Sequence, residues 1–159
     1  MYVPFNELPA SARLWIYSLD RVLSEEEQTN LQQEAVTFLN QWQAHGKDLH
    51  ASMRLEEGRF LIIAVDESSA GATGCSIDSS VGFVRQVAEN YKTDPFNRTT
   101  VYFQGITEGF PMNALKSKIA SGEIHAESPM FNTVVQSKED FENNWILPAK
   151  DSWLSRFFN

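Results

Sequence analysis

The spacing of apolar residues changes along the chain, and these changes outline the predicted elements. Residues 13–17 are β-branched and aromatic, which is typical of a strand. After Ser24 the apolar residues recur at the helical period, namely Leu31, Ala35, Phe38, Leu39 and Trp42. Ser24 with Glu27 predicts a capping box, in which each side chain satisfies a backbone N–H of the first turn, and Gly46 is a suitable terminator. A strand followed by a capped helix is therefore expected.

A different period begins at residue 49. Apolar and polar residues alternate strictly over residues 49–56, which indicates a strand with one buried face. A turn at Glu57-Gly58 leads into residues 59–65, which are apolar on both faces. Such a run predicts a central strand covered on both sides.

The second half of the pattern repeats helix and strand. Small residues fill 68–74 and precede a second helix, whose buried stripe is Ile77, Val81, Val84, Ala88 and Tyr91. Residues 99–104 predict a further strand. The order β-α-β-β-α-β favours an α+β protein with a ferredoxin-like βαββαβ core over about residues 13–104, in which the first and third strands are central and parallel.

The remaining residues, 105–159, predict a C-terminal α/β extension packed onto that core. A short helix is expected at 113–121, ending at Gly122, and Ser137 is placed to cap another with Phe141 and Trp145 on its inner face. The aromatic tail 148–158 is expected to pack back on the domain and bury Trp153, or else to pack on a second subunit.

Composition bounds the class of protein. A chain of 159 residues with 42% apolar and 21% charged residues suits a single globular domain, 1–159. The longest apolar run, 60–65, is far too short to span a bilayer, and the N-terminus does not resemble a secretory signal. Cys75 is the only cysteine, which excludes an internal disulfide and fits a cytoplasmic location.

Charge excludes two classes of partner. Thirteen basic against 21 acidic residues give a formal charge of −8, and the basic residues are not clustered. Nucleic acids and anionic membranes are recognised by clustered Lys and Arg, so neither is an expected partner. A small anionic ligand in a local basic pocket, a protein partner or a homodimer remains open.

Several motifs resemble those of a family of small bacterial proteins whose members are sometimes labelled "ABC transporter ATPase". The motifs are His45-Gly46, Val65-Asp66-Glu67-Ser68, Gly74-Cys75-Ser76-Ile77-Asp78-Ser79-Ser80 and Pro148-Ala149-Lys150-Asp151-Ser152-Trp153. The resemblance covers nearly the whole chain and implies no established activity. The ATPase label does not suit the residues, because a Walker A loop needs a Lys after its second glycine, whereas Gly74 is followed by Cys75.

The start of the second helix is the most suggestive site. Free N–H groups and the positive end of the helix dipole favour anions there, and Arg21, with Lys150 or Arg156, could add a cation. The candidate ligand-binding residues are therefore Arg21, Gly74, Cys75, Ser76, Asp78 and Ser79. The competing interpretation is an ordinary helix cap at Ser76 or Asp78, with Cys75 as a small buried hydrophobic residue.

Two enzymatic alternatives use the same region. Cys75 could act as a nucleophile beside a histidine. In the expected topology His45 and His50 lie at the opposite end of the sheet, which leaves only His125. Alternatively, Asp66, Glu67 and Asp78 could hold a magnesium ion.

Histidine and cysteine are too few for a zinc site, and no cofactor is predicted. Trp153 beside Arg156 has the character of an interface hot spot. A binding or interaction module is therefore the leading hypothesis, and an enzyme is the alternative.

Overall fold

The computed structural model describes residues 1–159 as an α+β chain with four helices and several small antiparallel sheets, as the sequence predicted at this level. The helices are α1 (Glu25–Gln41), α2 (Gly74–Tyr91), α3 (Leu115–Ala120) and α4 (Lys138–Asn144). The strands are β1 (Arg13–Ser18), β2 (Gln43–Ala44), β3 (Lys47–Asp48), β4 (His50–Glu56), β5 (Phe60–Asp66), β6 (Thr100–Val101), β7 (Phe110–Pro111), β8 (Pro129–Phe131) and β9 (Ile146–Pro148). Single turns of 3-10 helix lie at Phe5–Glu7, Met112–Ala114, Ala149–Asp151 and Ser155–Phe157. None of the helices combines the length and the apolar composition that crossing a membrane requires.

The main sheet has the order β1-β5-β4, and both pairs are antiparallel. β5 is buried from Phe60 to Val65 because both of its neighbours and both faces of the sheet cover it. The prediction that the apolar run 59–65 forms the central strand is therefore confirmed. The alternating segment is also a strand, with Ala51 and Met53 turned toward the buried helical side.

The expected parallel pairing of the first and third strands is wrong. β1 is an edge strand antiparallel to β5, with Arg13 opposite Val65 and Ser18 opposite Phe60. After α1, the chain returns as β4, which runs parallel to β1 with one strand position left between the two. The tight turn after β4 then places β5 in that position. The sheet has only three strands, because β6 is two residues long and pairs with β7 instead. The ferredoxin-like topology is not shown.

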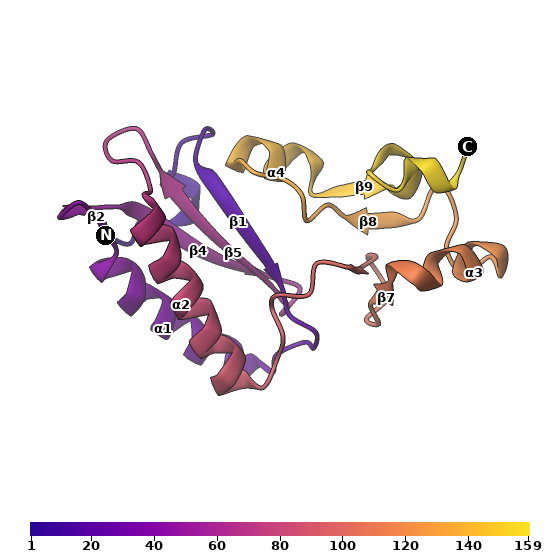
Figure 1. Ribbon diagram of the computed structural model, residues 1–159, viewed down its shortest axis with the longest axis horizontal. Helices are drawn as coiled ribbons and strands as arrows, with labels where there is room; N and C mark the ends of the chain where they lie inside the picture. The colour runs from indigo at the N-terminus through magenta and orange to yellow at the C-terminus, as the bar shows by residue number, and fades with distance from the viewer.

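Helices α1 and α2 cover one face of this sheet (Figure 1). The capping box at Ser24 and Glu27 is present as predicted. Helix α1 ends at Gln41, earlier than expected, and Gly46 lies instead in the β2–β3 hairpin, whose turn residues His45 and Gly46 have positive φ angles of 52° and 75°. A cluster of 18 buried residues joins the two helices to the sheet.

The other face of the sheet is covered by the N-terminal turn and by α4. Phe60 lies at the centre of this second cluster, with its ring 5.6 Å from that of Tyr102, 4.8 Å from Phe131 and 5.1 Å from Trp145. Ser137 caps α4 as predicted, because its hydroxyl accepts a hydrogen bond from the amide of Asp140. This cluster connects residues 1–94, the sheet region, to residues 95–159, the C-terminal region.

The C-terminal region extends beyond one end of the sheet (Figure 1). Its core is a separate cluster of eight buried residues, to which β6 and Phe103 already contribute, so the region begins before residue 105. The tail is ordered and packs back through Ala149 and Leu154, which are 0% and 1% exposed. The prediction that the tail buries Trp153 is wrong, because Trp153 is 37% exposed and Leu154 occupies the core instead.

Candidate functional site

The start of α2 is an ordinary reciprocal cap. Its N-cap is Thr73, and neither Ser76 nor Asp78 has that role. Ser76 is 2% exposed, and its hydroxyl accepts from the amide of Thr73 (2.7 Å) while its own amide donates to the Thr73 hydroxyl (3.3 Å). The backbone carbonyl of Ser76 also accepts from the Trp42 indole (2.8 Å). Ser76 is therefore fully engaged within the protein.

The other predicted residues of this helix start face solvent. Gly74, Cys75, Asp78 and Ser79 are exposed, and the Ser79 hydroxyl donates to the Cys75 carbonyl (3.1 Å). The Cys75 thiol is exposed rather than buried, and its sulfur makes no hydrogen bond that would activate it. These four residues lie on one face of the first two turns of α2, and none of them lines one of the five principal hollows of the protein.

The structure does not bring Arg21 to this helix start. The guanidinium donates to the carbonyl of Tyr91 (3.1 Å), the last residue of α2, and pairs with Glu27. At about 1.5 Å per residue, the 18 residues of α2 separate the two ends by roughly 27 Å. A cation beside the orphan carbonyls of a helix C-terminus is favourable, so Arg21 stabilises the opposite end of the same helix.

The charge environment of Arg21 is built within the sheet region. The hydrogen bonds from the Arg21 guanidinium, and after them the one from the Ser24 amide, lower the pKa of Glu27 to about 2. Asp20 beside it accepts from the Thr93 hydroxyl (2.6 Å), which holds the pKa of that carboxyl below its usual value. Both acids hold local structure together.

The magnesium alternative is not supported, since no group of three His, Cys, Asp or Glu residues converges anywhere in the chain. Asp66 accepts from the amide of Ser68 (2.9 Å), and the Ser68 hydroxyl and amide lower the pKa of its carboxyl. Glu67 accepts from the amide of Ala72 (2.9 Å). These carboxylates order the loop before α2.

The expected distance between His45 and Cys75 rested on the parallel topology and is not supported. Because β5 runs antiparallel to β1, the end of α1 meets the start of α2, as the Trp42–Ser76 hydrogen bond shows. His125, by contrast, belongs to the C-terminal region and follows α3 in the chain, and α3 lies at the far end of the molecule from α2 (Figure 1). Lys150 pairs with Glu127 in that same region, and the Arg156 guanidinium lies over the Phe157 ring there.

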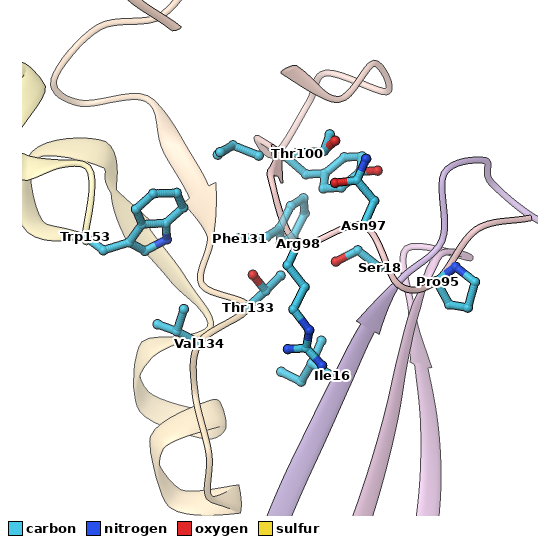
Figure 2. A pocket seen from close by; sticks show the side chains of 12 residues that line it. Ile16, Ser18, Pro95, Asn97, Arg98, Thr100, Phe131, Thr133, Val134 and Trp153 are labelled. Carbon is cyan, nitrogen blue, oxygen red and sulfur yellow. The ribbon is translucent and has the colours of Figure 1, made fainter. Parts of the chain in front are cut away.

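A different site lies along the free edge of β1. Two adjoining hollows of about 150 and 510 Å³ follow this edge, and both are lined by Ile16, Arg98, Thr133 and Val134. We call them together the β1 groove. In Figure 2 the Arg98 side chain extends between Ile16 of β1 and Thr133 of the facing segment. The groove is therefore formed where the sheet region and the C-terminal region meet.

The backbone of β1 is unpaired where it faces the groove. The amide of Leu14 donates away from β5, to the carbonyl of Gln136 (3.0 Å). Backbone groups alternate in direction along a strand, so Ile16 and Ser18 also turn their N–H and C=O groups away from β5. No other segment bonds to them there. The edge is thus closed at Leu14 and open from Ile16 onward.

The side chains around the open edge combine an unpaired cation with exposed apolar surface. Arg13 and Glu67 also line the larger hollow, where they pair with each other (3.7 Å). Arg98 is exposed and has no carboxylate within ion-pair distance. Val134 and Trp153 are 58% and 37% exposed, which makes two of the chain's six exposed large hydrophobic residues part of one groove. Figure 2 shows both on the side opposite β1.

Sequence reasoning singled out two side chains of this groove, and one of them, Glu67, was proposed only as a magnesium ligand. Trp153 was singled out as interface-like, whereas the Asn97-Arg98-Thr99 triplet carries no signal beyond a chance glycosylation pattern. An edge strand cannot be told from an inner one until pairing is known. Comparisons of the chain with protein-family models, curated proteins and solved structures found no match.

Proposed function

We propose that the protein is an interaction module that binds an extended, acidic segment of a partner protein along the β1 groove. The observation that carries this proposal is the open edge of β1 at Ile16 and Ser18, which borders a hollow. An extended segment can add to such an edge through main-chain hydrogen bonds, and pockets beside the edge then select its side chains. The start of α2 lacks the added cation, because Arg21 lies at the opposite end of that helix.

Charge and exposure indicate the chemistry of the segment. Arg98 presents a guanidinium without a carboxylate partner, and such a group binds a carboxylate through paired hydrogen bonds. Val134 and Trp153 offer apolar contact on the facing wall. Salt screens charges more than about 8 Å apart at physiological ionic strength, so the chain's net charge of −8 opposes an acidic ligand only weakly. The one carboxylate that lines the groove, Glu67, is paired with Arg13 (3.7 Å).

The open edge itself can be tested by amide hydrogen exchange. The amides of Trp15 and Tyr17 point toward β5, whereas those of Ile16 and Ser18 point into the groove. We expect slow exchange at 15 and 17 and fast exchange at 16 and 18, since only bonded amides are protected. Uniform protection along β1 would contradict the open edge.

Binding is tested with a synthetic hexapeptide of alternating Glu and Val, titrated into the labelled protein and followed by amide chemical shifts. We expect shifts along β1 and at Arg98, new protection at Ile16 and Ser18, and no binding of the matching Lys-Val peptide. Arg98→Glu should weaken binding about tenfold, a loss of about 1.4 kcal/mol. Arg85→Glu, the same charge change on an exposed face of α2, should leave it unchanged.

Two results would overturn the proposal. One is equal binding of the acidic and basic peptides, and the other is equal loss in the Arg98 and Arg85 variants. Sedimentation of the free protein tests the remaining alternative, in which a second copy of the chain occupies the β1 groove. A dimer that Arg98→Glu dissociates would place that copy, and no foreign segment, on the β1 edge.

A further inference from the structure

Arg59 is a buried cation without a counter-charge. It directly precedes β5, is 5% exposed, and has no carboxylate within ion-pair distance. Its Nε donates to the carbonyl of Leu19 (3.2 Å), its Nη1 to that of Thr107, and its guanidinium lies 4.4 Å from the centre of the Tyr102 ring. Buried charges are ordinarily paired, so this arrangement leaves a positive charge balanced only by carbonyl dipoles and a ring.

A hollow of about 310 Å³ lies against this guanidinium. The third nitrogen of Arg59, Nη2, makes no hydrogen bond within the protein. It is not enclosed either, because the only enclosed polar side-chain atom without a partner is the Ser52 hydroxyl. Since Arg59 is otherwise buried and lines this hollow, its free donor faces into it.

The walls of the hollow show what could accompany an anion. Ile106 contributes partly exposed apolar surface and Phe103 lines the hollow as a fully buried ring, while the exposed Val22 and Glu57 stand at the rim. Tyr102 and Phe131 lie between this hollow and the β1 groove, because both residues line this hollow and also the smaller hollow of the groove. The hollow therefore joins one desolvated guanidinium to apolar walls, with a single carboxylate at the mouth.

We propose that this hollow, the Arg59 pocket, binds a small oxyanion that carries an apolar group, either a carboxylate or a phosphate monoester. A guanidinium is the side chain best suited to bind the paired oxygens of a carboxylate or a phosphate, and its attraction for an anion is strongest where water is excluded. The apolar walls favour an organic anion over an inorganic one. This site is separate from the proposed peptide groove, because it uses another cation and another hollow.

The test uses benzoate, phenyl phosphate and inorganic phosphate as probes, titrated into the full chain at constant ionic strength by calorimetry. We expect phenyl phosphate or benzoate to bind with at least about tenfold higher affinity than inorganic phosphate. The stronger of the two organic probes identifies the headgroup. If none of the three binds, or if inorganic phosphate binds as tightly as both organic probes, the proposal fails.

Variants at the rim test the location without disturbing Arg59. Val22 is 42% exposed, so Val22→Trp should fill the mouth without cost to the fold and weaken binding about tenfold. Ile146→Trp, at a residue that is 38% exposed and does not line the hollow, is the matched control and should leave affinity unchanged. Glu57→Gln removes the opposing charge and should tighten binding several-fold. If all three variants bind the organic probe as tightly as the unmodified protein does, the proposed location of the site is wrong.

Two further variants separate this site from the peptide groove. Arg59→Gln should abolish binding, and its circular dichroism spectrum should be recorded because the Leu19 and Thr107 bonds are lost with it. Arg98→Glu should leave the affinity for the organic anion unchanged, since Arg98 lines the β1 groove and not the Arg59 pocket. Loss of anion binding in Arg98→Glu with retention in Arg59→Gln would contradict the proposal.

Discussion

The sheet region and the C-terminal region are built on different principles. The first contains two helices of 17 and 18 residues, each with a reciprocal cap, and packs them on strands of six or seven residues through a cluster of 18 buried side chains. The second has helices of six and seven residues and strands of two or three, around a cluster of eight. Regular elements hold the first together, whereas aromatic packing and turns hold the second.

The difference matters because the two candidate sites lie where these regions meet. The β1 groove is bounded on one side by a regular strand and on the other by irregular segments. The Arg59 pocket likewise has the start of β5 on one side and the loop that contains Gly105 and Thr107 on the other. A rigid strand paired with an irregular wall offers fixed backbone groups beside side chains that can vary, which suits recognition.

The largest expected effect concerns Phe60, which packs the two regions together. Phe60→Ala removes a fully buried ring that contacts three aromatic rings of the C-terminal region, and should lower the free energy of unfolding by about 3–5 kcal/mol. Urea unfolding is followed by circular dichroism and by tryptophan fluorescence. Phe96→Ala, at an exposed ring that packs edge-on to Tyr17, should cost no more than about 1 kcal/mol.

Coincident transitions by the two probes would mean that the regions unfold together in both variants. Separate transitions in the unmodified protein would contradict this and make the C-terminal region an independent unit.

The next effect distinguishes two neighbours in the tail. Leu154→Ala removes a side chain that is 1% exposed in the C-terminal cluster and should cost about 2–5 kcal/mol. Trp153→Ala, although it removes a larger ring, should cost only about 0.5 kcal/mol because surface positions contribute little. Melting temperatures decide the order, and a larger loss at Trp153 than at Leu154 would show that the tail packs differently.

A smaller effect, of opposite sign, concerns the sheet face that both regions share. The Ser52 hydroxyl is buried there without a partner, so Ser52→Ala should stabilise the protein by about 1 kcal/mol. Ser80 is the matched control, since its buried hydroxyl donates to the Ile77 carbonyl (2.7 Å), and Ser80→Ala should be destabilising by about 1 kcal/mol. Urea denaturation measures both. A destabilising Ser52→Ala would mean that the hydroxyl has a partner.

The smallest effect is a pH dependence that belongs to the sheet region. Because Arg21 lowers the pKa of Glu27 from 4.5 to about 2, this carboxylate stabilises the folded state above pH 4.5, and the contribution is lost as the pH falls toward 2. Glu27→Gln should therefore flatten the fall of the urea midpoint over that window. The exposed neighbour in Glu26→Gln serves as the control, and identical slopes in the two variants would show that the pair does not stabilise the fold.

The sequence by itself determined the elements whose pattern is periodic and local. Leu31, Ala35 and Leu39 repeat at the helical spacing, Ser24 and Glu27 cap that helix, and the apolar run of β5 requires cover on both faces, so each could be located without any partner. The site could not be located in this way. The start of α2 looks like an anion site in sequence, yet its cap uses the amide and the hydroxyl of Ser76, and the expected cation, Arg21, lies at the other end of the helix.

Only the tertiary structure decided the strand order, and the sites follow from that order. Apolar alternation specifies which face of a strand is buried but not which strand lies beside it. The same sequence pattern would therefore fit a central β1 parallel to β5, whereas in the structure β1 is an edge strand antiparallel to β5. The roles proposed for Arg98 and Arg59 also depend on the tertiary structure. Each is an isolated cation in the sequence, and only the meeting of distant segments places one beside an unpaired edge and leaves the other buried without an acid.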